Sequence, residues 1–160
     1  MSTTDWVRGA SMNGKHELMD SLMVQTAQKT GFDSLNLILF SVGEVLFGID
    51  ADHVSEITAF NGQKSDDLFW FHEEMCYGDK TVIYHSPTIV TIRTEEGLPY
   101  RVIIDSLESI SECSPDDISP FPALLEPFVL RSGIWGILSQ NGRTILLVDF
   151  KRFLRQKGKD

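Results

Sequence analysis

The sequence predicts a mainly β fold, and three observations support this prediction. From Leu35 onward, short runs of aliphatic and aromatic residues are separated by turn residues, which is typical of many strands and not of alternating strand and helix units. The Asn141-Gly142 pair lies between two apolar runs, and both residue types tolerate the positive φ of a type I′ hairpin turn. A chain of 160 residues that is 42% hydrophobic suffices for one ordinary domain, with at most two subdomains sharing a core.

The first 34 residues differ in pattern from the rest of the chain. After a polar leader, large apolar residues recur at helical spacing within 16–28, namely Leu18, Met19, Leu22 and Met23. This spacing predicts an amphipathic helix that ends near Gly31. Its apolar stripe is expected either to dock on the chain's own core or to enter a groove of a partner, and both alternatives stay open.

The body of the chain begins with a predicted hairpin. Strands over 35–42 and 45–50 are joined through Gly43-Glu44, and the second strand alternates apolar residues onto one face. The next segment, 51–60, is predicted to form a short helix or turn. Asp52 is available to cap its start, and three apolar residues follow at helical spacing, namely Val54, Ile57 and Phe60.

The middle of the chain is predicted to hold further strands after an aromatic segment. Residues 68–77 are the densest aromatic stretch and include Phe69, Trp70 and Phe71. Strands are then expected between turns that contain glycine or proline, over 81–84, 88–93, 100–105 and 107–113.

The last third of the chain is predicted to form a hairpin and a closing helix. Prolines at 120, 122 and 127 indicate an irregular connection, because proline lacks a backbone donor and fixes φ. Strands over 134–140 and 143–150 then flank Asn141-Gly142, and a helix over 149–156 is expected to end the domain.

Charge and hydropathy exclude several classes of protein. The formal net charge of −9 and a pI near 4.8 argue against nucleic-acid binding, because an acidic surface repels phosphates. No apolar stretch approaches the roughly 20 residues of a spanning helix, so no direct membrane insertion is expected. The N-terminus has no apolar run of signal-peptide length, and we therefore predict a cytoplasmic location.

The inventory of reactive residues predicts a protein that is not an enzyme. The sequence contains neither a Gly-x-Ser-x-Gly nucleophile turn nor a glycine-rich phosphate loop. His72 and Cys76 have the i, i+4 spacing of metal ligands, but no third ligand is obvious, and a half-buried helical turn is the preferred interpretation. We expect no catalytic residues, no cofactor and no metal.

The order of the strand motifs resembles the CheW-like family of chemotaxis coupling proteins. The first half contributes the run from Leu37 to Asp50, followed by Val54-Ser55-Glu56-Ile57. The second half contributes a series of motifs in the family's order: Val102 to Leu107, Ile118-x-Pro120-x-Pro122, Ile134-Trp135-Gly136-Ile137, Asn141-Gly142-Arg143, Ile145 to Asp149, and Phe153-Leu154. The resemblance covers about 35–154, and it divides the chain into an N-terminal extension over 1–34, a CheW-like domain over 35–155 and a basic tail over 156–160.

This resemblance implies both a fold and a function. The fold would be two small β-barrel subdomains of about five strands each, with short helices beside the N-terminal amphipathic helix. The function would be that of a non-enzymatic adaptor or scaffold in bacterial chemotaxis signal transduction. Such an adaptor couples chemoreceptors to a CheA-type histidine kinase through contacts with the kinase's regulatory domain and with the receptor's signalling tip.

The segment that should face the receptor departs from the family pattern. The family carries an Asn-Leu-Arg-Gly-like motif with a receptor-facing arginine, and no residue within 69–84 matches that arginine. The alternative is therefore a divergent CheW-like interaction domain that serves a different signalling partner and has lost receptor coupling. The candidate partner-binding residues are apolar, namely Ile49, Val54, Ile57 and Phe60 of the first element and Phe69, Trp70 and Phe71 of the departing segment.

Overall fold

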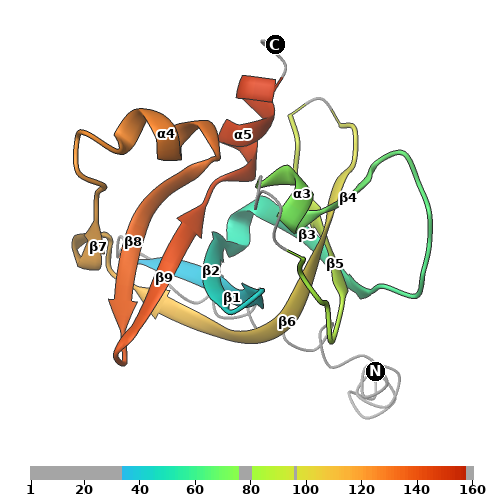
Figure 1. The fold of residues 1–160 in the computed structure, drawn as a ribbon, viewed down its shortest axis with the longest axis horizontal. Coiled ribbons are helices and arrows are strands. Elements are labelled where there is room, and N and C mark those ends of the chain that lie inside the picture. Colours follow the sequence, from blue (N-terminus) through green and yellow to red (C-terminus); the bar gives the residue numbers. More distant parts are fainter. Residues whose placement is uncertain (1–33, 76–80, 96, 158–160) are drawn as a thin grey trace, which may run out of the picture.

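The computed structural model describes residues 34–75, 81–95 and 97–157 (Figure 1). This part of the chain forms a nine-stranded sheet in the order β3-β5-β6-β1-β2-β9-β8-β7, with β4 paired to β6 off that path. The mainly β prediction is confirmed. The strands are β1 (Leu35–Val42), β2 (Val45–Asp50), β3 (Val54–Ala59), β4 (Leu68–Trp70), β5 (Thr88–Ile92), β6 (Tyr100–Cys113), β7 (Ile118–Ser119), β8 (Ile134–Gln140) and β9 (Arg143–Val148). The helices are α3 (Phe71–Glu74), α4 (Glu126–Arg131) and α5 (Phe150–Lys157), and the 3₁₀ turns are η1 (Ala51–His53) and η2 (Pro115–Asp117).

The long strand β6 connects two lobes of the molecule. Its first half pairs with β4 and β5, and its second half pairs with β1 (Figure 1). The pairing shifts register where Phe40 faces Leu107 but Ser41 faces Asp105, so Ser106 is an extra residue with φ of 29°. The predicted strand over 107–113 is therefore a continuation of β6. We call β3, β4, β5 and α3 the first lobe, and β7, β8, β9, α4 and α5 the second lobe.

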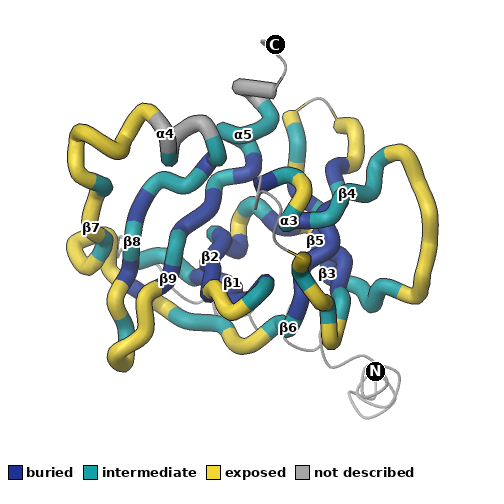
Figure 2. The backbone as a smooth tube through the Cα atoms, viewed as in Figure 1, coloured by how far each residue is buried: buried dark blue, intermediate teal, exposed yellow. Residues whose placement is uncertain are grey.

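The β1–β2 hairpin lies between two hydrophobic cores, and it is buried on both faces (Figure 2). One set of its side chains faces a large cluster, the main core, and consists of Ile38, Phe40, Val42, Phe47 and Ile49. The alternate set faces a smaller cluster, the second core, and consists of Leu37, Leu39 and Leu46. Period-two alternation in a strand pair thus supplies both cores, which explains why this stretch is apolar almost throughout.

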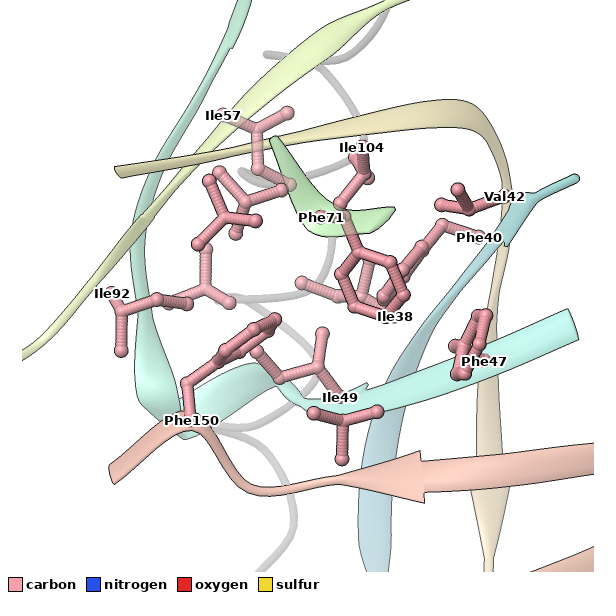
Figure 3. Packing of buried hydrophobic residues seen from close by; sticks show 14 of the residues in the cluster. Ile38, Phe40, Val42, Phe47, Ile49, Ile57, Phe71, Ile92, Ile104 and Phe150 are labelled. Carbon is pink, nitrogen blue, oxygen red and sulfur yellow. The ribbon is translucent and has the colours of Figure 1, made fainter. Parts of the chain in front are cut away.

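Phenylalanine rings form the centre of the main core (Figure 3). The ring of Phe71 meets those of Phe40 and Phe47 at centroid distances of 5.3 and 4.6 Å, in edge-to-face geometry. Phe150, the first residue of α5, completes the contact at 5.9 Å. Phe40 and Phe47 come from β1 and β2, and Phe150 from α5. The ring of Phe71, the first residue of α3, packs among them, and this contact holds the short helix in place.

The expected short helix or turn over 51–60 is corrected in part. Only Ala51–His53 forms a 3₁₀ turn, and Val54–Ala59 is the strand β3. The pairing of β3 with β5 shifts between Val54 and Glu56, so the inserted residue places Val54 and Ile57 in the same core. The bulge gives Val54 and Ile57 a spacing of three residues, which resembles the spacing in a helix. The 3₁₀ turn is capped by the Asp50 carboxylate, which accepts the N–H of Asp52, and not by Asp52 itself.

Two further predictions are corrected. Residues 81–84 do not form a strand, because both edges of β6 over 101–103 are already paired, with β4 and with β5. The proline-containing connection is not wholly irregular, since it includes η2, β7 and the helix α4. Pro127 is tolerated in the first turn of α4, where a backbone donor has no partner within the helix.

The remaining predicted elements in the described part of the chain are confirmed. Both hairpin turns have positive φ at their two central residues, 56° and 59° at Gly43-Glu44 and 53° and 74° at Asn141-Gly142. The closing helix α5 begins after Asp149, whose carboxylate accepts a hydrogen bond from the backbone N–H of Arg152. The predicted N-terminal helix over 16–28 lies outside the described residues. No helix among the described residues is long and apolar enough to cross a membrane.

The placement of Phe71 predicts a large loss of stability when its ring is removed. Phe71→Ala is expected to lower the free energy of unfolding by about 3–5 kcal/mol, because the ring is fully buried among three other phenylalanines. Ile83→Ala is the control, since Ile83 is 68% exposed, and its effect is expected to stay within about 0.5 kcal/mol. Urea unfolding followed by circular dichroism measures both. Equal midpoints for the two variants would contradict the placement of Phe71 in the core.

Candidate interaction surface

Four of the seven apolar residues predicted to bind a partner lie in the main core. The exposed fraction is 0% for Ile49, Val54 and Phe71, and 2% for Ile57. Side chains without accessible surface cannot contact another protein directly. We therefore correct their assignment. These four residues are hydrophobic because they belong to the main core, and they stabilise the fold.

The other three predicted residues are half-buried and lie on two faces of the first lobe. Phe69 packs against the main core, with its ring 5.4 Å from that of Tyr100. Phe60 and Trp70 contact each other instead, with ring centroids 5.3 Å apart. Adjacent residues of β4 point to opposite faces, so Phe69 turns inward while Trp70 turns outward.

Trp70 is the centre of a half-buried aromatic group that we call the aromatic platform, formed by Phe60, Trp70, His72 and Tyr84. The indole ring is 4.8 Å from the ring of Tyr84 and 6.1 Å from that of His72. These side chains come from the end of β3, from β4, from α3 and from the segment before β5. The platform thus joins four pieces of chain on one face of the first lobe.

Hydrogen bonds fix the position of Tyr84 in the platform. Its hydroxyl oxygen accepts the backbone N–H of His72 at 3.2 Å and lies 3.0 Å from the Nδ1 atom of His72. Burial raises the pKa of Tyr84 to about 12. The hydrogen bond from the His72 backbone lowers this pKa, whereas the negative charges of Asp105 and Glu73 raise it further. The phenol is therefore neutral at physiological pH and can donate its proton to a ring nitrogen.

A buried carboxylate holds the segment that carries Tyr84. Asp105 is 4% exposed, and it accepts the N–H of His85 at 3.0 Å with each oxygen and the N–H of Ser86 at 2.6 Å. These charge-assisted bonds replace the ladder that residues 81–86 do not form. Asp105 lies beside the extra residue Ser106 at the bulge in β6. The residue next to the bulge thus holds the segment that contributes Tyr84 to the platform.

An ion pair fixes the beginning of β4. The guanidinium of Arg101 donates to both carboxylate oxygens of Asp67, at 3.1 Å from Nε and 2.9 Å from Nη2. Hydrogen bonds from Arg101 and from the Ser65 hydroxyl lower the pKa of Asp67 to about 2. The backbone N–H of Arg101 also donates to the Asp67 carbonyl, so the pair sets the register from which Trp70 projects.

A second apolar surface lies on the second lobe. Leu124 is 83% exposed and Leu125 is 49% exposed. Both lie in the connection between β7 and α4, which is largely exposed (Figure 2). Single exposed apolar residues are common on protein surfaces, but here two exposed leucines are adjacent in the chain. Sequence reasoning missed them because the surrounding prolines indicated only a connection.

The described residues do not form a recognisable metal site. Within residues 34–75, 81–95 and 97–157, no three His, Cys, Asp or Glu side chains gather around one point. His72, one half of the candidate metal motif, belongs to the platform through Tyr84, and it lies in the predicted helical turn, now α3. Its proposed co-ligand Cys76 is outside the described residues.

His72 and Tyr84 are platform residues that sequence reasoning did not select. The sequence indicates His72 only as a possible metal ligand, and it places Tyr84 in a strand that does not form. The feature of the sequence that could have indicated these two residues is the clustering of aromatic side chains before and after 76–80. Their contact depends on how the Asp105 carboxylate folds the chain back, which no spacing in the sequence encodes.

Comparisons with known proteins support the fold. No protein-family model and no curated protein sequence matches the chain. Among solved structures, the scaffolding protein TtCheW from Thermoanaerobacter tengcongensis superposes with a TM-score of 0.57 at 13% sequence identity, over 79% of this chain and 90% of that one. The chain therefore has a CheW-like fold, as its motif order predicted.

The carboxylate of Asp105 predicts a local effect when it is removed. Asp105→Ala is expected to accelerate hydrogen exchange at the amides of His85 and Ser86 and to cost about 1.5–3 kcal/mol, because both amides lose their hydrogen bonds to a buried carboxylate. Amide exchange measured by NMR tests this, with the exposed Asp117→Ala as the control. Unchanged protection of both amides would refute the role of Asp105 as their acceptor.

The Asp67–Arg101 pair predicts a pH-dependent contribution to stability. Since the pKa of Asp67 is lowered from 3.8 to about 2, the pair stabilises the fold fully above about pH 4, and this contribution is lost as the pH falls through about 2. Asp67→Asn should therefore be less stable than the wild type near neutral pH, and the difference should shrink below about pH 4 and vanish below about pH 2. Urea unfolding over this range measures it. The exposed neighbour Asp66→Asn is the matched control, and a difference of equal size in both variants would contradict the prediction.

Proposed function

We propose that this chain is a non-enzymatic adaptor of bacterial chemosensory signalling that acts in the cytoplasm through protein contacts. Its partner of first choice is the regulatory domain of a CheA-type histidine kinase. The observation that carries this proposal is the CheW-like fold over 79% of the chain, together with the family's strand motifs in their order. Fold alone does not define a function, and binding to the kinase domain is the property that tests the proposal.

The distribution of exposed apolar residues supports an adaptor role. An adaptor must hold two partners at once, and this molecule has apolar groups on separate lobes. The aromatic platform around Trp70 is on the first lobe, and Leu124 and Leu125 are on the second, beyond the β1–β2 hairpin (Figure 1). A few residues contribute most of the affinity in protein interfaces, and Trp and Tyr, both present in the platform, are enriched among them.

Receptor coupling is the second contact that the family resemblance implies, and one observation favours the divergent alternative. The segment that carries the family's arginine here supplies Trp70, His72 and Tyr84 to the aromatic platform. A receptor tip that pairs with a cation would find a different chemistry on this face. In the alternative, the chain retains the CheW-like fold and binds another signalling protein through the platform.

Binding to the kinase is tested by calorimetric titration of the full chain into the regulatory domain of a CheA-type kinase from the same cell, at physiological salt. Saturable binding at micromolar or tighter affinity is expected. Leu124→Ser and Trp70→Leu are the informative variants, since one of the two surfaces should account for most of the affinity. Leu124→Ser is expected to fold like the wild type, because its side chain is 83% exposed.

The titration has a clear negative outcome. Absence of heat at two temperatures, with the chain shown to be folded by circular dichroism, would overturn kinase coupling. Using two temperatures matters, because a binding enthalpy that passes through zero at one temperature reappears at another when apolar surface is buried. Binding that neither variant weakens would instead move the contact away from both apolar surfaces.

A further inference from the structure

We infer that the aromatic platform binds a basic segment of a protein partner, with a cationic side chain of that partner placed against Trp70 and next to Glu73. The inference rests on the proposed role of the platform as an interaction surface, and it specifies the chemistry of the occupant. Two features support it, namely the ring cluster itself and the negative charge that accompanies it.

The ring cluster gives the platform an affinity for cations. Trp70 is half-buried and contacts three rings, those of Phe60, His72 and Tyr84, so its indole is held in place before any partner arrives. Indole and phenol faces attract guanidinium and ammonium groups, and Trp is the strongest of the aromatic residues in this respect. Little side-chain entropy remains to be lost on binding.

Carboxylates supply the charge complementarity. Glu73 is exposed and directly follows the platform residue His72 in α3. Burial is the main cause that raises the pKa of Tyr84, and the charge of Glu73 adds to it. The segment 63–84 carries two lysines against five carboxylates. Asp67, one of the five, is paired with Arg101 of β6, which leaves four carboxylates against the two lysines.

The two features together select one kind of occupant. A purely apolar segment would leave Glu73 facing a desolvated interface without a partner, which costs free energy. An acidic segment would meet like charge. A segment that carries arginine or lysine beside apolar residues satisfies both the rings and the carboxylate, and it is also steered toward a protein with a net charge of −9.

A peptide titration followed by NMR tests the inference with the full chain labelled with ¹⁵N. The probe is a short blocked peptide of arginine and leucine, and its control is the same peptide with citrulline in place of each arginine, which removes the charge and keeps the shape. Trp70→Phe identifies the indole resonance of Trp70 among those of the three tryptophans. We expect a saturable shift of this resonance with the arginine peptide and little or none with the citrulline peptide.

A charge-matched pair of variants separates a site from general attraction. Glu73→Gln and Asp116→Asn each remove one negative charge, and Asp116 is an exposed residue of η2, away from the platform in sequence and in the fold. Only Glu73→Gln should weaken peptide binding, by about two- to fivefold, as expected for an exposed charge pair. High salt should weaken binding as well.

Three results would overturn the inference. The first is equal weakening by Glu73→Gln and Asp116→Asn, which would indicate attraction to the net charge alone. The second is a saturable shift confined to residues outside the platform, and the third is no shift at any peptide concentration. None of these results depends on the kinase titration, so failure of the inference is distinguishable from failure of the proposed adaptor function.

Discussion

Burial of both faces of the β1–β2 hairpin is the constraint on which the rest of this structure depends. A strand pair with two apolar faces cannot lie at a surface, so chain must be packed on each side of it. One side receives β3, β5, α3 and the start of α5 in the main core, and the other receives β8 and β9 in the second core. The division into two lobes follows from this burial, because one hairpin contributes side chains to two cores.

The bend in β6 connects that core arrangement to the candidate interaction surface. Ser106 is the extra residue at which the strand passes from one lobe to the other, and its neighbour Asp105 is buried beside the bend. A buried carboxylate needs donors, and two backbone amides of the segment that carries Tyr84 supply them. The geometry of the sheet and the shape of the aromatic platform are therefore parts of one arrangement.

The fold constrains function mainly through which apolar residues it leaves accessible. The core buries four of the apolar residues that were predicted to bind a partner, namely Ile49, Val54, Ile57 and Phe71. Trp70 and Leu124 retain exposed surface on different lobes. The adaptor function proposed for this chain needs separate contacts of this kind and needs no reactive group. Residues 69–84 carry aromatic rings and carboxylates, and the CheW-like fold is retained around them.

The sequence by itself determined the mainly β class, the hairpin through Gly43-Glu44, the type I′ turn at Asn141-Gly142, the closing helix and the CheW-like fold, because these depend on local spacing and on turn residues. It misread Val54–Ala59, where a bulge gave a strand the spacing of a helix, and it took core residues for a binding surface. Only the tertiary structure decided which apolar side chains are exposed and brought Tyr84 onto Trp70. Burial and contacts between distant residues depend on strand pairing and on the Asp105 hydrogen bonds, which no local pattern specifies.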